Sequence, residues 1–416
     1  MNMAGSQFKG KEDKGTIGIA NMHANRAAAR LGEEGILRGT SGCIFDDDGH
    51  FVMLPVVQEA YRALTPDEIA PYTMGPKEYL DDCIAECFGA SRPEGVIAAI
   101  PTPGSTPALH HAVCGYSEPG DTVLTSDWHW GSYENLCNHN GRKLETFHLL
   151  DDTGTFNLAD FKKHVMDILA GQEEITIILN SPANNPTGYS LTDSEWDGVI
   201  DVLKEAAKTG KRIIFVSDVA YIDYSGEREA CRTFFKKFGG LPENILILVA
   251  YTLSKGFTLY GQRAGALICV TPREDVAKEF VTIGNCMSKC AWGSCSFAPM
   301  NAMMRIMRDP AKRAELYKER KDNFDMIRAR AEIFTKEAEE TSLAMLPYRC
   351  GFFITIPMKD DSAVCALLEK KNIFLVPIGG AIRIAICSIP KAKVHGLAGA
   401  IKEAEKEAAL AARKAG

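Results

Sequence analysis

Four polar side chains of different chemistry follow short apolar runs of this chain. They are Asn185, Asp218, Tyr221 and Lys255. In an open sheet of parallel strands, ligands bind outside the carboxyl ends of the strands, so residues that end such runs are the first candidates for a site. A lysine amine is a nucleophile when neutral, a carboxylate stabilises a cation, and an amide or a phenol supplies hydrogen bonds. Each alone also fits a turn, a helix cap, a packed ring or a solvated charge, but together they indicate one chemical site.

A further apolar run leads into a helix start that suits an anion. Gly104, Ser105 and Thr106 follow this run, and a helical pattern continues from Ala108. The free backbone N–H groups and the dipole of a helix N-terminus attract negative charge. Gly-Ser-Thr before a helix is also an ordinary cap, so this segment alone would not define a site.

Six apolar runs predict the strands that position these residues. The runs do not alternate with polar residues, which is typical of strands buried on both faces. Helical spacing lies between them, as in Trp196, Val199 and Leu203 after a capping start at Thr192. The alternation predicts an α/β fold with a mostly parallel central sheet covered by helices. The runs are residues 95–100, 122–124, 175–179, 212–216, 245–249 and 265–270.

After residue 272 the pattern changes to that of a smaller α+β domain. Long, charged helices are expected around 298–340, strands at 351–356 and 382–386, and a final helix over about 391–414. The expected domains are an N-terminal segment of the small domain, a large domain and the C-terminal part of the small domain, over 1–60, 61–305 and 306–416.

The composition is that of an ordinary globular protein. Charged residues are 24% of 416, with 36 Gly and 19 Pro, which excludes collagen-like and disordered classes. The net charge of −7 provides no basic field, so nucleic-acid binding is not expected. The first eleven residues contain no apolar segment and no later run approaches membrane-spanning length, so we expect a cytoplasmic protein without membrane contact.

The cysteines point to a reducing compartment. There are 13 of them, an odd number in a long chain. The closest pairs, Cys83/Cys87 and Cys286/Cys290, match neither zinc nor redox spacings. We expect reduced core residues and no metal.

Three segments carry a resemblance to a known family. They read Asn-Pro-Thr-Gly at 185–188, Asp-Val-Ala-Tyr at 218–221 and Ser-Lys-Gly-Phe-Thr-Leu-Tyr-Gly-Gln-Arg at 254–263, and Arg383 follows. In this order and spacing they resemble the fold type I pyridoxal-phosphate (PLP) aminotransferases, in the class I group of aspartate and aromatic aminotransferases. The resemblance runs from about Gly39 to Arg383. It implies PLP as cofactor and transfer of an amino group from an L-amino acid to a 2-oxo acid such as 2-oxoglutarate.

The resemblance also implies a role for each residue toward the cofactor. Lys255 would form the Schiff base with PLP and move the substrate proton. Asp218 would keep the pyridine nitrogen protonated, and Asn185 and Tyr221 would hydrogen-bond the phenolic oxygen of the ring. The expected phosphate ligands are Ser105, Thr106, Thr252, Ser254 and Arg263.

Further positions match the substrate and partner residues of the family. Trp128 would stack on the cofactor ring, although Trp130 stands only two residues away. Arg383 would bind the substrate α-carboxylate, and Gly42 would let the backbone approach the substrate. Tyr72 would complete the phosphate site of a neighbouring subunit, which implies a homodimer with shared active sites.

The substrate side chain is the least defined part of the resemblance. Relatives that are specific for dicarboxylates carry an Arg in the region of residues 287–296, where this chain has none. If Trp292 aligns with the family's aromatic residue, Lys289 replaces that Arg; otherwise a neutral residue does. A lysine is a point charge and not a bidentate fork, so aromatic, broad and aspartate-like preferences stay open.

Two other functions share parts of this pattern. A PLP-dependent cysteine-S-conjugate β-lyase uses the same Lys, Asp and Arg and would release pyruvate and ammonia without an acceptor. A PLP-fold regulator would need a basic helical domain ahead of the fold, whereas the resemblance starts near residue 39. Residues 259–263 are more similar to the aminotransferases, so transamination is the leading hypothesis.

Overall fold

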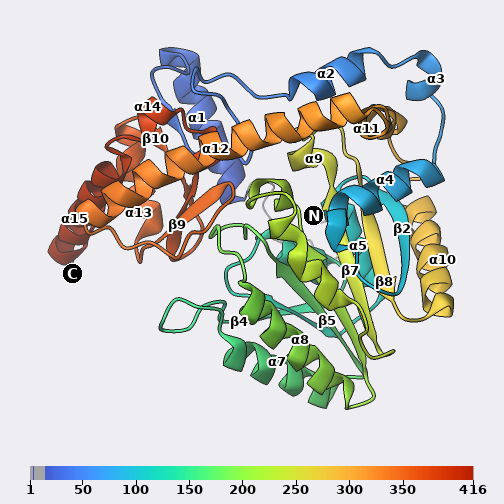
Figure 1. Cartoon of the computed structure of the whole chain (residues 1–416). Helices are drawn as coiled ribbons and strands as arrows, with labels where there is room; N and C mark the ends of the chain where they lie inside the picture. Colours follow the sequence, from blue (N-terminus) through green and yellow to red (C-terminus); the bar gives the residue numbers. More distant parts are fainter. Residues whose placement is uncertain (1–2, 4–14, 416) are drawn as a thin grey trace. The chain divides into compact units, whose positions relative to one another are not determined.

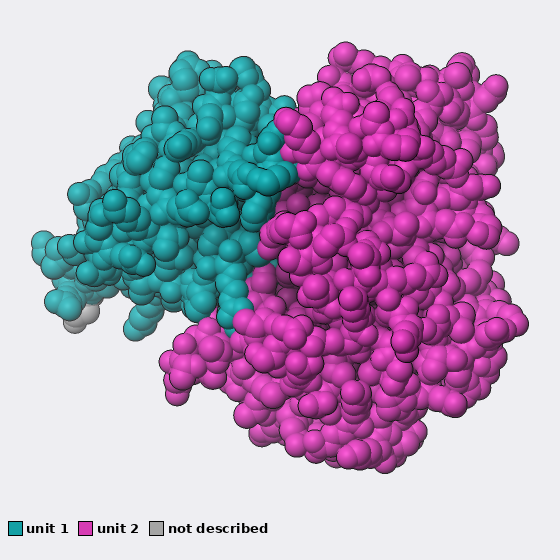
Figure 2. Space-filling model, viewed as in Figure 1, with its two compact units in different colours: residues 1–52, 183–189, 321–416 teal, residues 53–182, 190–320 magenta. Residues whose placement is uncertain are grey.

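Residue contacts divide the chain into two units, which Figure 2 shows in two colours. The computed structural model describes residue 3 and residues 15–415. Unit 1 comprises 1–52, 183–189 and 321–416, and unit 2 comprises 53–182 and 190–320. The expected domain boundaries after residues 60 and 305 stay a prediction. Most of the first eleven residues, which the expectation of a cytoplasmic protein uses, lie outside the described residues.

A seven-stranded sheet forms the centre of unit 2. Every apolar run expected to form a strand does so, and the sheet gains one additional strand, β4. In spatial order the strands are β2 (Val96–Thr102), β8 (Gly265–Thr271), β7 (Ile245–Thr252), β6 (Arg212–Asp218), β5 (Glu174–Asn180), β3 (Thr122–Ser126) and β4 (Lys143–Phe147).

The register of the sheet brings chemically useful residues to one edge. β3, β4, β5, β6 and β7 pair in parallel, and β8 runs antiparallel to both of its neighbours. Asp218 at the end of β6 stands opposite Asn180 in β5 and Ala250 in β7. Because parallel strands end at the same edge, residues that follow β5, β6 and β7 emerge close together.

Helices cover both faces of this sheet. Ile214 and Val216 of β6 share a core cluster with Leu109 of α5 (Ser105–Gly115) and Phe280 of α10 (Glu274–Ala291). Phe215, which points to the other face, packs edge-on against Trp196 of α8 (Asp193–Ala207) at 6.2 Å between ring centroids. Successive side chains of a strand alternate between faces, so the apolar runs are buried on both sides, as expected.

The helices of unit 2 connect these strands, and Figure 1 shows α7 and α8 side by side along the sheet. The α-helices are α2 (Pro55–Arg62), α3 (Pro66–Ile69), α4 (Lys77–Phe88), α5 (Ser105–Gly115), α6 (Ser132–His139), α7 (Leu158–Gly171), α8 (Asp193–Ala207), α9 (Leu253–Gly256), α10 (Glu274–Ala291) and α11 (Phe297–Arg308). Short 3-10 helices are η2 (Gly89–Ser91), η3 (Ile222–Tyr224) and η4 (Ala230–Phe238). The long helix α12 (Pro310–Glu340) leaves unit 2 at Arg320 and continues in unit 1.

Unit 1 is built around a small antiparallel sheet. β12 (Ala381–Ala385) lies between β11 (Val376–Pro377) and β9 (Phe353–Pro357), and β1 (Leu37–Arg38) pairs in parallel with β10 (Ile373–Phe374). The buried Arg330 of α12 ties the N-terminal part to the segment that follows β12, because it donates to Asp47 Oδ1 at 2.7 Å and to the Cys387 carbonyl at 3.0 Å. The remaining helices are α1 (Thr16–Leu31), α13 (Asp361–Lys370), η5 (Ile386–Ser388), α14 (Lys391–Val394) and α15 (Leu397–Ala415).

One expected helix is corrected. The single final helix over 391–414 is two helices, α14 and α15, because the chain turns at Gly396, which has φ of 81°. Glycine adopts this left-handed conformation without the steric cost of a Cβ atom. In the part of the chain that the structure describes, no helix combines the length and apolarity needed to cross a bilayer.

Candidate functional site

Asp218 is a buried carboxylate at the carboxyl edge of the sheet. Its side chain accepts a hydrogen bond from the Tyr133 hydroxyl at 2.5 Å and another from the Ala220 backbone N–H at 3.1 Å. Burial raises the pKa of Asp218 to about 6, although both hydrogen bonds act to lower it. A carboxylate in this setting gains from a cationic or proton-sharing partner, such as a protonated ring nitrogen.

Tyr133 is a site residue that the sequence analysis did not single out. It lies on α6, is fully buried, and stacks against His129 with 6.0 Å between ring centroids. The ring of Trp130 packs edge-on against it at 5.8 Å and, partly buried, against the core cluster. Because Trp130 packs there, Trp128, half-buried just beyond β3, remains the residue expected to stack on the cofactor.

Lys255 lies in the short helix α9, directly after β7. The Thr252 hydroxyl accepts the Ser254 N–H at 3.1 Å and so caps this helix. The Lys255 Nζ lies 5.4 Å from the centroid of the Tyr221 ring and 4.8 Å from that of Tyr260. The structure thus places the Lys255 amine close to the rings of both Tyr221 and Tyr260.

An anion cradle lies beside Lys255. Arg263 donates to the Ser254 hydroxyl at 3.2 Å and to the Tyr260 carbonyl at 2.9 Å. Its guanidinium lies so close to Gly104 that a Cβ there would be 2.6 Å from Nη2. Gly104 immediately precedes Ser105 and Thr106, which open α5, so Arg263, a serine hydroxyl and a helix N-terminus converge.

The backbone of this cradle is held in an uncommon conformation. Arg263 has φ of 54°, which costs a residue with a side chain about 1 kcal/mol or more. Its side chain is exposed, whereas Thr252 and Ser254 are buried. A permanently charged fork that is held open to solvent beside two hydroxyl groups fits a phosphate.

Unit 1 holds the residues expected to bind substrate. Arg383 is 4% exposed in the central strand β12, and its guanidinium lies 4.5 Å from the Phe353 ring. It donates to Asn185 Oδ1 at 3.3 Å and to the Thr40 carbonyl at 3.2 Å. Gly42 follows Thr40 by two residues, so Arg383, Asn185 and the backbone near Gly42 belong to one cluster.

Tyr72 and Lys289 lie apart from these clusters. Tyr72 is 95% exposed in the loop before α4. Lys289 is exposed in the last turn of α10, where Trp292 ends the helix and stacks on His111 at 4.6 Å between ring centroids. Their expected roles concern the partner subunit and the substrate side chain, and these stay predictions.

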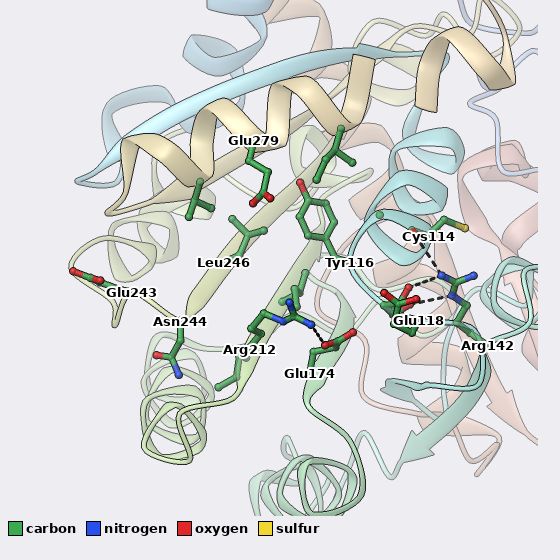
Figure 3. Close-up of a pocket in the computed structure, with 16 residues that line it drawn as sticks. Cys114, Tyr116, Glu118, Arg142, Glu174, Arg212, Glu243, Asn244, Leu246 and Glu279 are labelled. Carbon is green, nitrogen blue, oxygen red and sulfur yellow. Dashed lines mark hydrogen bonds and ion pairs between the residues drawn. The ribbon is translucent and has the colours of Figure 1, made fainter. Parts of the chain in front are cut away.

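A separate pocket opens at the opposite edge of the sheet (Figure 3). Its volume is about 300 Å³, and Glu174, Arg212 and Asn244 mark the starts of β5, β6 and β7 around it. Arg212 and Glu174 form an ion pair, and Tyr116 and Glu279 point into the same space. None of the expected site residues lines this pocket, so substitutions there are suitable controls for the site.

Comparison with known proteins gives the family. The model of "Aminotransferase class I and II" matches residues 41–401. An aminotransferase from Anaerococcus prevotii has 33% identity and a TM-score of 0.95, with 97% of this chain and 100% of that chain covered. The aromatic-amino-acid aminotransferase from Burkholderia pseudomallei, whose structure is covalently bound to pyridoxal phosphate, shares the fold at TM-score 0.78 with 21% identity, over 96% and 100% of the two chains.

Curated relatives agree with this result. The aspartate aminotransferase of Pseudomonas aeruginosa is 23% identical over 86% of this chain and 90% of its own length. The mitochondrial aspartate aminotransferase P2 of Lupinus angustifolius is 26% identical over 68% of this chain, and the match spans only 61% of the relative. Because the family model spans residues 41–401, far more than half of the sequence, the chain belongs to the class I and II aminotransferases.

Proposed function

We propose that the protein is a PLP-dependent aminotransferase that transfers the amino group of an L-amino acid to a 2-oxo acid such as 2-oxoglutarate. The observation that carries this proposal is the arrangement within unit 2: Lys255 lies beside Tyr221, and Ser254 and Arg263 form the anion cradle next to it. The buried Asp218 ends the neighbouring strand β6. Family membership and the PLP-bound relative support the same reaction.

The residues present fit this cofactor. Asp218 is a buried carboxylate with raised pKa that suits a protonated pyridine nitrogen. Arg263, Ser254, Thr252 and the start of α5 suit its phosphate. When bound, PLP withdraws electrons from the substrate Cα and so makes the Cα proton removable.

The side chains of the protein supply the other functions. Lys255 would carry the cofactor as a Schiff base through Nζ, and once released would take the proton from the substrate Cα. Asp218 would hold the proton on the ring nitrogen, and Tyr221 and Asn185 would hold the phenolic oxygen by hydrogen bonds. Trp128 would fix the plane of the ring by stacking.

Substrate binding is assigned to the cluster in unit 1. Arg383 is permanently charged and buried, and it would bind the α-carboxylate as a bidentate ligand. The backbone around Gly42 would border the same position. For the substrate side chain, aromatic, broad or aspartate-like donors remain in the proposal, with Lys289 as the candidate partner of a distal carboxylate.

The active assembly we propose is a homodimer. A tyrosine that is 95% exposed in one chain is available to complete a phosphate site in a second copy, which fits Tyr72.

All 13 cysteines are free, which supports a reducing compartment and the proposed cytoplasmic location. Nothing in the comparisons favours the β-lyase over the aminotransferase.

The test of this function is product analysis with matched variants. Purified protein with PLP, a panel of amino acids and 2-oxoglutarate is expected to form glutamate, and Lys255→Ala is expected to lose this activity by several orders of magnitude. Tyr116→Phe, in the pocket at the opposite edge of the sheet, is the control that keeps activity. Pyruvate and ammonia from cysteine conjugates without an acceptor would instead identify a lyase.

A further inference from the structure

Arg320 is a buried charge that contacts the turn after Lys255. Its Nε donates to the carbonyl of Gly256, the residue after Lys255, at 2.5 Å. Its guanidinium also lies 4.6 Å from the centroid of the Phe257 ring. The side chain is 5% exposed and reaches the turn from α12. Arg320 thus holds both the backbone and a side chain of the turn that presents Lys255.

Asp223 joins the same arginine to the turn after Tyr221. Asp223 lies in η3, two residues after Tyr221, and its Oδ1 is 3.4 Å from Arg320 Nη1. It also accepts a hydrogen bond from Arg232 Nη2 at 2.5 Å. Burial acts to raise the pKa of Asp223, but the guanidinium groups of Arg320 and Arg232 outweigh it and lower that pKa, so the carboxylate is charged.

The two turns are in close contact at Gly256. A Cβ atom at this position would lie 1.9 Å from Asp223 Oδ2 and 3.1 Å from Arg320 Nη2. Only glycine lets the carboxylate and the guanidinium approach the backbone this closely. A displacement of Asp223 or Arg320 therefore acts directly on the residue next to Lys255.

The far side of the cluster is anchored in α4 and η4. Glu86 is fully buried and accepts from Arg320 Nη1 at 2.5 Å, from Arg228 Nη2 at 2.9 Å and from the Tyr317 hydroxyl at 2.8 Å. Arg232 is also fully buried and donates to the Cys87 carbonyl at 3.1 Å. These buried contacts hold the side chains of Arg320 and Asp223 in a single arrangement.

We propose that Arg320 and Asp223 are positioning residues for the proposed chemistry. They clamp the turn after Lys255 to the turn after Tyr221 and thereby fix Nζ at its 5.4 Å from the Tyr221 ring. The inference rests on the proposed role of Lys255. Buried ion pairs add little net stability compared with apolar packing, whereas a displacement of about 1 Å at a reacting group can lower a rate on the order of 10²-fold.

The test uses one variant that changes the geometry of the contact and one that changes its charge. Arg320→Lys keeps the positive charge but loses the planar fork and the Nε donor to Gly256, and Asp223→Asn keeps the shape and loses the charge. With PLP bound, both are expected to shift the pH midpoint of the visible absorbance of the Lys255–cofactor linkage. Both are expected to lower kcat by roughly 10- to 100-fold, with KM for the amino acid little changed.

Arg228→Lys is the matched control. Arg228 also pairs with Glu86, at 2.9 Å, but among the described residues its guanidinium otherwise contacts Glu229 and the Tyr317 ring, and not the turn of Lys255. This variant is expected to lower the unfolding temperature and to keep the wild-type pH midpoint and kcat. A merely structural role of the cluster would give all three variants the same pattern, and that pattern would contradict the inference.

The outcomes are separable from those of the proposed function. Folded, PLP-loaded Arg320→Lys and Asp223→Asn with wild-type pH midpoint and kcat would overturn the clamp alone. A wild-type visible band that persists in Lys255→Ala would overturn the proposed role of Lys255. If either single variant does not fold, the neutral pair Asp223→Asn/Arg320→Met replaces it. This pair removes one negative and one positive buried charge, so the net charge of the cluster does not change. The double variant is therefore expected to fold and to show the same shift of the pH midpoint and the same loss of kcat.

Discussion

At the scale of single residues, Asp218 carries a pH dependence that can be measured without cofactor. Its pKa of about 6 lies above the value of ~3.9 that an aspartate has in an unfolded chain. The folded protein therefore binds the extra proton between these values, and its stability falls as pH rises from about 4 to about 6. Asp218→Asn is expected to stabilise the cofactor-free protein above pH 6 by about 2–3 kcal/mol and to remove this slope. Urea unfolding from pH 4 to pH 8 measures both; an unchanged slope in the variant would contradict the assignment.

Tyr133 is the partner through which the protein tunes Asp218. Tyr133→Phe removes the 2.5 Å hydrogen bond to the carboxylate and leaves the buried ring in place. A hydrogen bond to a charged group contributes about 1.5–3 kcal/mol, so kcat with PLP is expected to fall by roughly 10- to 100-fold. Steady-state kinetics measure this, with Tyr116→Phe, a phenol in the pocket at the opposite edge of the sheet, as the control. Equal kinetics in both variants would remove Tyr133 from the site.

Arg263 tests the phosphate end of the site. Arg263→Ala is expected to weaken PLP binding by 10-fold or more, because it removes at least one charge-assisted hydrogen bond to the phosphate. Saturating PLP is expected to restore most of kcat. Fluorescence titration of the cofactor-free protein measures the affinity. Arg212→Ala, whose side chain pairs with Glu174 at the opposite edge, is the charge-matched control. Equal PLP affinities in the two variants would show that Arg263 does not bind the phosphate.

The sequence predicted most of these residues and missed others for identifiable reasons. Lys255, Asp218 and Arg263 stand in contiguous motifs, so type and spacing revealed them. Tyr133 lies 85 residues from its partner Asp218 and occupies an apolar face of a helix, so its pattern is that of a core residue. Arg320 similarly belongs to a long charged helix, and nothing in its spacing shows that it is buried.

At the scale of elements, α8 shows how local signals set an element that packs on the sheet. Thr192 and Glu195 form the expected capping box, in which each side chain accepts the backbone N–H of the other residue. Thr192→Ala is expected to lower the free energy of unfolding by about 1 kcal/mol without changing kcat. Thr192→Ser retains a hydroxyl and is expected to keep most of the wild-type stability. Chemical unfolding measures the difference; equal losses in both variants would contradict a role of the hydroxyl.

The elements that escaped the sequence lack such signals. Strand β4, Lys143–Phe147, lies at the edge of the sheet and mixes polar with apolar residues. It is mostly exposed, so no apolar run marks it in the sequence. The division of the last helix at Gly396 depends on one backbone angle, which its neighbours in the sequence do not specify. A buried apolar run or a capping box can be recognised from residues that are close together in the sequence. The pairing of an edge strand depends on residues that are far apart in it.

At the scale of the whole molecule, the proposed homodimer can be tested through Tyr72. If Tyr72 completes the partner's site, mixing Lys255→Ala with Tyr72→Ala dimers is expected to restore activity. Each hybrid then has one site with an intact lysine and an intact tyrosine, giving up to about a quarter of wild-type activity after random exchange. If Tyr72 acts only in its own chain, hybrids gain nothing over the parent variants. Activity measured before and after subunit exchange distinguishes the two.

The visible absorption spectrum shows whether Lys255 holds PLP and whether the protein exchanges amino groups through it. The purified protein is titrated with PLP and then with glutamate, aspartate, phenylalanine, tyrosine and alanine in turn. We predict a visible band that Lys255→Ala lacks, that bleaches with at least one amino acid, and that returns with 2-oxoglutarate. A band that no amino acid bleaches, or one that Lys255→Ala retains, would contradict it.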